Sequence, residues 1–243
     1  MGNRRPVWRY GAPAVLLLAG LLFATGANTA QVELGGGRQE QLSGLVAQES
    51  RKVDAHTAQV QRLRSSVDQA SRARARDDLR TKHAQRAADR LRQPAGLEQV
   101  SGSGLRVTLD DAPRSVGSEE DGEVPPDYLV VHQQDVQAVV NAMWAGGATA
   151  VQVMDQRLIA TSAVRCVGNT LVLQGRVYSP PFTVTAIGPP DAIRAAVDRA
   201  PGVRIYRQYV DAYGLGYDVH EVNGVTVPGY TGSLDLHYAH GTH

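Results

Sequence analysis

Residues 130–156 read VVHQQDVQAVVNAMWAGGATAVQVMDQ and carry the most regular pattern in the chain. Apolar residues in the middle of this stretch recur every three or four positions, which predicts a helix with one buried face. The predicted stripe consists of Val136, Val139, Val140, Met143 and Trp144. Gly146 and Gly147 favour the end of the helix, and the alternation over residues 148–153 predicts a strand. We therefore expect a helix and a strand of one domain core.

The segments on either side of this stretch predict the other elements of the same domain. Strands are predicted at 104–111, 158–162, 170–174, 182–187 and 203–210, and a second helix at 192–200. Without the insertion at 158–180 the order is strand, helix, strand, strand, helix, strand, as in ferredoxin-like split β-α-β domains. We expect an α+β domain at 97–232 with a small β insertion, two helices on one sheet face, and an added edge strand near Pro228.

The N-terminal part predicts a membrane anchor. Residues 11–30 carry no charge, and twenty helical residues extend about 30 Å, the thickness of the hydrocarbon core of a bilayer. Three arginines lie within residues 1–10 and none lies immediately after the apolar segment. This asymmetry predicts a single-pass protein of the cell membrane, with residues 1–10 in the cytoplasm and the domain outside it. The alternative is a cleaved signal peptide.

Residues 38–93 predict a coiled-coil stalk. Val46, Val53, Val60 and Val67 are spaced by seven, and Leu63 lies on the same seam. One continuous helix of this length would extend about 80 Å. We expect the stalk to pair with itself, as a homo-oligomer, or with a helix of another envelope or division membrane protein. The alternative is a solitary solvated helix, which is difficult to stabilise at this length.

The charge is divided between two regions. Residues 38–93 hold 13 basic and 7 acidic residues, whereas residues 94–243 hold 9 basic and 16 acidic residues. The run from Arg72 to Arg80 has no aromatic residue for base stacking. Its predicted location outside the cytoplasm also argues against nucleic acid. We interpret the run as a solvated helix face, with anionic envelope material as the alternative partner.

Five sequence blocks resemble a known family. In chain order they read HQQDVQAVVNAMWAGGATAVQV, DQRLIATSAVRCVGNTLVLQG, PPFTVTAIG, YGLGYDV and VPGYTG. Together they resemble the domain of unknown function 881 family over residues 97–232, and the N-terminal anchor and coil are typical of it too. The resemblance implies a bacterial envelope protein whose genes often lie near those for cell division and wall synthesis. The chain departs from the family at Asp155, where members often carry asparagine.

Four residues are candidates for contact with a ligand or partner. His132 precedes the first predicted helix, and it is either a general base or part of the helix entry together with Asp135. Asp155, Arg157 and Arg165 are the other three candidates. The two arginines either bind an anion or form ion pairs with Asp155 or with the acidic loop over residues 112–127.

The sequence predicts no cofactor and no metal site. Cys166 is the only cysteine, which excludes a zinc site built from several cysteines, and we expect it to be buried as a small apolar residue. His237, His240 and His243 have metal-like spacing, but we expect residues 233–243 to form a disordered tail. The chain contains no nucleophile elbow, P-loop, zincin or complete dinucleotide-binding motif, so we expect no catalytic residue and no enzyme.

Two functions remain at this point. The first is a noncatalytic membrane-anchored scaffold that mediates protein–protein interactions in cell division or wall synthesis. The second is an extracytoplasmic sensor or binding domain for a small anionic ligand or cell-wall fragment, which would use Arg157, Arg165 and the acidic loop. A flat apolar surface would favour the scaffold, and a cleft with convergent polar groups would favour the ligand.

Overall fold

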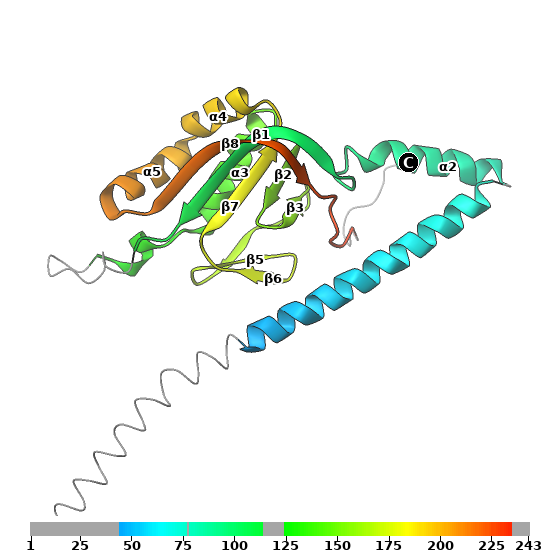
Figure 1. The fold of residues 1–243 in the computed structure, drawn as a ribbon, viewed down its shortest axis with the longest axis horizontal. Coiled ribbons are helices and arrows are strands. Elements are labelled where there is room, and N and C mark those ends of the chain that lie inside the picture. Colours follow the sequence, from blue (N-terminus) through cyan, green and yellow to red (C-terminus); the bar gives the residue numbers. More distant parts are fainter. Residues whose placement is uncertain (1–43, 77, 114–123, 235–243) are drawn as a thin grey trace, which may run out of the picture. The chain divides into compact units, whose positions relative to one another are not determined.

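A five-stranded sheet and three helices build the domain in the computed structural model, which describes residues 44–76, 78–113 and 124–234 (Figure 1). The chain divides into two units, Met1–Lys52 and Val53–His243, and the domain lies within the second. The predicted cytoplasmic tail and membrane anchor lie outside the described residues. Within the described ranges, no helix combines the length and apolar character of a membrane span.

The strand order of the large sheet is β3-β2-β7-β1-β8, and every neighbouring pair is antiparallel. Its strands are β1 (Val100–Asp110), β2 (Ala150–Val153), β3 (Gln156–Leu158), β7 (Phe182–Ile187) and β8 (Gly216–Val227). The prediction of an α+β fold is therefore confirmed. Three helices contact one another or the sheet: α3 (Gln133–Ala145), α4 (Pro190–Arg199) and α5 (Pro201–Tyr213).

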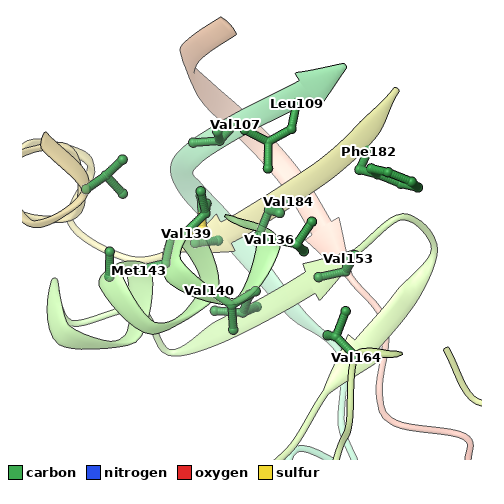
Figure 2. Close-up of a cluster of buried hydrophobic side chains, with 14 of the residues drawn as sticks. Val107, Leu109, Val136, Val139, Val140, Met143, Val153, Val164, Phe182 and Val184 are labelled. Atoms are coloured by element: carbon green, nitrogen blue, oxygen red, sulfur yellow. The ribbon is translucent and has the colours of Figure 1, made fainter. Parts of the chain in front are cut away.

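The core lies between α3 and one face of the sheet (Figure 2). Val136, Val139 and Met143 on α3 are at most 1% exposed. They pack with alternate residues of β1 and β7, because successive strand side chains point to opposite faces. The helical stripe was predicted correctly for these residues and wrongly for Trp144, which is 39% exposed.

The end of α3 depends on a close contact with α4. A Cβ atom on Gly146 would lie 2.6 Å from Ile193 Cα, so only glycine allows the two backbones to approach this closely. Gly147 follows in the left-handed conformation at φ 87°, which a residue without a Cβ adopts at little cost. The predicted helix stop at these two glycines is confirmed.

The insertion forms a second, three-stranded sheet. Its order is β4-β5-β6, with β4 at Arg165–Val167, β5 at Thr170–Leu173 and β6 at Arg176–Tyr178. The predicted strand at 170–174 is present, whereas the one at 158–162 is replaced by β3 and a turn. Leu171 and Leu173 are each 1% exposed and join the main core, so the insertion packs on the domain.

The predicted last strand at 203–210 is wrong, because these residues belong to helix α5. Tyrosine and valine favour strands, but Pro201 occupies the first helical position and Val203, Tyr206 and Val210 repeat at helical spacing. Val203 and Tyr206 are 1% and 3% exposed. The strand that follows, β8, is much longer than the edge strand expected near Pro228.

The segment predicted as a stalk contains two helices among its described residues, one over 44–74 and α2 (Leu79–Arg92). The segment does not form a single continuous helix, because a new helix, α2, begins after its N-cap residue Asp78. Its carboxylate accepts hydrogen bonds from the backbone amides of Arg80 (3.1 Å) and Thr81 (3.2 Å). A side chain that satisfies these amides favours a helix start over helix continuation.

Candidate functional site

Both helices of the 44–92 segment expose apolar side chains. α2 contains no buried residue, although its apolar positions and those of the preceding helix follow a helical repeat. The exposed residues are Leu45 (54%), Val46 (45%), Val60 (41%), Leu63 (59%), Val67 (66%), Leu79 (73%) and Leu91 (64%). We call this set the exposed stripe. A stripe of this kind remains in water unless another surface covers it.

The two helices contact each other through polar side chains. Arg72 donates to Asp89 at 3.2 Å, and Gln85 donates to Asp68 at 3.4 Å. Val60, Leu63 and Val67 line an open groove beside Ala88 of α2. The polar contacts therefore hold α2 alongside the first helix without burying the stripe.

His132 begins α3 and belongs to its cap. The His132 backbone amide donates to the Asp135 carboxylate at 2.8 Å, and the imidazole Nδ1 lies 3.8 Å from the same carboxylate oxygen. Burial raises the pKa of Asp135, although the hydrogen bond and the charge of His132 act in the opposite direction. The adjacent cavity, about 240 Å³ and lined in part by Tyr206 and Tyr209, is small for a ligand pocket. The helix-entry interpretation explains this pair.

Asp155 lies in the turn between β2 and β3 and binds three side chains. Tyr178 donates to its carboxylate, Gln156 donates at 2.9 Å, and Arg176 forms an ion pair with it at 3.0 Å. Burial raises the pKa of Asp155, but the hydrogen bonds from Tyr178 and Gln156 and the charge of Arg176 outweigh this and lower it. Burial and the hydrogen bond to Asp155 raise the pKa of Tyr178. The carboxylate is thus satisfied by residues of the insertion and of its own hairpin.

Arg157 lies two residues further on β3, and its surroundings are different. The whole residue is 4% exposed, and among the described residues the only hydrogen bond of its side chain runs from Nη1 to the carbonyl oxygen of Pro228 at 3.2 Å. Its Nε is buried and has no acceptor among the same residues. No carboxylate in the described part of the chain forms an ion pair with Arg157, and burial lowers the pKa of its guanidinium. A buried cation without a counter-charge is costly and therefore uncommon.

A cavity of about 560 Å³ lies beside Arg157. We call it the Arg157 cavity; its lining residues are Pro94, Ala95, Gly96, Trp144, Arg157, Leu158, Ile159, Ala160, Thr161 and Leu234. Its volume is within the range of ligand pockets. Gly96 is in the left-handed conformation, and a Cβ there would lie 2.7 Å from Ile159 Cγ2 and 3.6 Å from Arg157 Nη2. Glycine thus leaves room at this wall of the cavity.

Arg165 and Cys166 lie elsewhere, on β4 of the small sheet. Both are exposed, so the expectation that Cys166 is buried is wrong. β4 is an outer strand of the three-stranded sheet, and all three of its residues are exposed. Arg165 does not line the Arg157 cavity and has no ion pair with Asp155.

The structure therefore separates the four candidates. Asp155 and Arg157 share one hairpin but not one site, and His132 and Arg165 lie on other elements. Sequence reasoning missed Arg176 and Tyr178, which bind Asp155, and it missed the cavity walls at Gly96 and Leu234. No signal within a short stretch connects these residues, because the fold brings them together from distant positions. Among the described residues no group of acidic, histidine or cysteine side chains could hold a metal, and the three terminal histidines lie outside them.

Comparison with known proteins places the chain among uncharacterised bacterial proteins. The UPF0749 protein Rv1823 of Mycobacterium tuberculosis is 29% identical over 226 residues, covering 91% of this chain and 73% of that protein. The UPF0749 protein YlxW of Bacillus subtilis is 36% identical over 115 residues, covering 47% and 48%. A crystal structure of an uncharacterized conserved protein from Mycobacterium tuberculosis is 24% identical with a TM-score of 0.46, covering 63% of this chain and 96% of that one. The model of the family "Bacterial protein of unknown function (DUF881)" matches residues 87–240, and the chain belongs to that family.

Proposed function

We propose that the protein is a noncatalytic, membrane-anchored scaffold of the cell envelope that acts through protein–protein interactions in cell division or wall synthesis. The observation that carries this proposal is the exposed stripe on residues 44–92. Each leucine or valine that becomes fully buried stabilises a complex by about 1.5–3 kcal/mol. A stripe of this length thus favours association with another apolar helix face.

A second copy of the same segment is the partner that the stripe fits best. Val46, Val60 and Val67 differ by multiples of seven, so they lie along one seam of a left-handed coiled coil. A seam with a seven-residue repeat is complementary to itself. Homo-oligomerisation through this segment is therefore part of the proposal, and helices of other envelope or division proteins are the competing partners.

The proposal also includes a finer description of the fold. The segments β1, α3, β2, β7, α4–α5 and β8 follow the split β-α-β order, and the sheet order β2-β7-β1-β8 supports a ferredoxin-like domain. β3 adds a fifth strand beside β2. In this description the helices occupy one face and the domain is presented by the helical segment.

Self-association is tested with matched triple variants of the full-length protein. Val60→Asp, Leu63→Asp and Val67→Asp together place charges on the seam, whereas Ala58→Asp, Arg62→Asp and Ser65→Asp place them on the exposed opposite side of the same helix. We expect the seam variant to become monomeric in light scattering and the control to remain oligomeric.

A deletion of residues 38–93 tests the role of the segment in cells. If in-cell crosslinking captures the same partners after this deletion, the segment is only a spacer.

Location is tested through Cys166, the only cysteine of the chain, which is exposed. We expect a membrane-impermeant maleimide to label Cys166 in intact cells. A Cys166→Ser variant with Gly2→Cys should be labelled only after the membrane is permeabilised. The reverse pattern would contradict the proposed orientation.

A further inference from the structure

We propose that the Arg157 cavity binds an organic carboxylate that carries an apolar group. Such a site goes beyond the scaffold function and is independent of the exposed stripe, so either proposal can fail without the other. The sequence-based alternative combined Arg157 with Arg165 and the acidic loop. The structure retains only Arg157 and adds an apolar cavity.

The missing counter-charge is the first argument. The domain carries acidic residues on its surface, yet none pairs with Arg157 within residues 44–76, 78–113 and 124–234. A buried cation in a protein is usually paired with a carboxylate. Nearby, even the partly exposed Arg176 is paired with Asp155. An anion that enters the cavity would supply the charge that Arg157 lacks.

The guanidinium group of Arg157 has one NH2 group left to bind such an anion. Nη1 donates to the Pro228 carbonyl oxygen, and Nε is fully buried without an acceptor among the described residues. No hydrogen bond from Nη2 is formed within the same residues, so Nη2 is the group that can donate to a ligand in the cavity. A charge-assisted hydrogen bond from Nη2 favours a carboxylate over the corresponding neutral amide.

The walls identify the rest of the ligand. Trp144 is not buried with the other apolar residues of α3: it is 39% exposed and lines the cavity. Leu158, Ile159 and Leu234 also contribute apolar surface to the cavity. Among the described residues, Arg157 is the only charged one in the lining. An inorganic anion would leave these apolar walls in water, whereas an aliphatic or aromatic group next to the carboxylate would cover them.

A purely structural role for Arg157 predicts different behaviour. Arg157 packs against Gly96 and binds Pro228, so it could simply join residues 94–97 to the segment after β8. In that case Arg157→Gln would lower the melting temperature. If Arg157 is kept for a ligand, removing its unpaired charge leaves the melting temperature of the free protein unchanged or raises it.

The test uses the fluorescence of Trp144 in the full-length protein with Trp8→Phe, because the chain has two tryptophans. The probes are N-acetyl-phenylalanyl-leucine, the same compound as its terminal amide, octanoate, and inorganic phosphate. We expect a saturable change with the acid, binding of the amide weakened at least about tenfold, and no saturable change with phosphate. Tighter binding of octanoate than of the peptide acid would assign the alkyl carboxylate as the source, and the reverse would assign a peptide terminus.

Variants complete the test. Arg157→Gln should weaken binding of the acid by a factor of about 30 or more, and Arg165→Gln, which removes an exposed arginine, should leave it unchanged. Equal binding of the acid and the amide by the protein that keeps Arg157 would overturn the proposal. This comparison does not require the Arg157→Gln variant, so it is valid even if that variant fails to fold. Binding of the acid that is retained by a folded Arg157→Gln variant would also overturn it.

Discussion

Helix α3 and the helix over residues 44–74 carry similar apolar repeats but have opposite surroundings. Val139 and Met143 on α3 are at most 1% exposed, whereas Leu63 and Val67 on the other helix are 59% and 66% exposed. The difference is the partner: α3 packs on its own sheet, and no surface of the described chain covers Leu63 or Val67 to a similar degree. A repeat therefore predicts a helix and its apolar face, but the burial of that face depends on a partner which the repeat does not specify.

The largest effect that separates the two helices is expected from truncation of one apolar side chain on each. Met143→Ala should lower the free energy of unfolding by about 2–5 kcal/mol, because it leaves a cavity in the core. Leu63→Ala should change it by less than about 0.5 kcal/mol in the monomer, because the leucine is already in water. Urea denaturation of both full-length variants, followed by tyrosine and tryptophan fluorescence of the domain, measures this difference. Equal losses would mean that Leu63 is buried in the folded protein.

The start of α2 gives a second test of the helical region. If α2 begins at Asp78, then Asp78→Ala removes the acceptor for the Arg80 and Thr81 amides and should shorten the helix. If residues 74–79 instead continue one helix, alanine should increase helicity, because it is the better helix former. Amide hydrogen exchange at Arg80 and Thr81 distinguishes the two results. We expect faster exchange in Asp78→Ala and an unchanged rate in Asp78→Asn, which retains the acceptor.

Local patterns predicted much of the domain. The helix over 133–145, the strand β7 and the helix α4 follow from periodicity and from proline or glycine at their ends. Helix α5 was missed because strand-favouring tyrosines outweighed the helical spacing of Val203, Tyr206 and Val210. Val203 and Tyr206 are buried and Val210 is partly buried. The 44–92 segment was correctly predicted to be helical, but its division into two helices was missed, because the capping role of Asp78 competes with a long helical repeat.

The candidate site was less predictable, because its properties depend on long-range contacts. Arg157 is two residues from Asp155, which favoured an ion pair between them. β3 pairs with β2 so that Arg157 lies opposite Gln152, and this register directs it toward Gly96 and Pro228. Asp155 instead binds Arg176 from the insertion. Neither partner choice is encoded near the residues themselves.

The Asp155 cluster provides a smaller effect within the domain. Tyr178→Phe removes the hydroxyl that binds both Asp155 and Gln156 and keeps the ring. We expect the free energy of unfolding to decrease by about 1 kcal/mol. This is less than a hydrogen bond to a buried charged acceptor usually contributes, because Asp155 is partly exposed. Thermal and urea unfolding measure the loss. Tyr128→Phe, at an exposed tyrosine, is the control and should be near neutral.

The smallest effect is a pH dependence of opposite sign for two carboxylates. The pKa of Asp155 is lowered below the ordinary value of 3.8, so its stabilisation is complete above that value and is lost as the pH falls through the lowered pKa. The pKa of Asp135 is raised by burial, so stability decreases as the pH rises from 3.8 through the raised pKa. Asp155→Asn and Asp135→Asn each remove one contribution and keep a hydrogen-bond acceptor. At neutral pH Asp155→Asn should be less stable than the unchanged protein, and this difference in the free energy of unfolding should disappear as the pH falls through the lowered pKa of Asp155. Asp135→Asn should become more stable relative to the unchanged protein as the pH rises above 3.8. Urea midpoints between about pH 2 and pH 7 measure how the stability difference of each variant changes with pH. If the two differences changed with the same sign, Asp155 and Asp135 would have similar environments, and the description of a hydrogen-bonded turn carboxylate and a buried helix-cap carboxylate would be wrong.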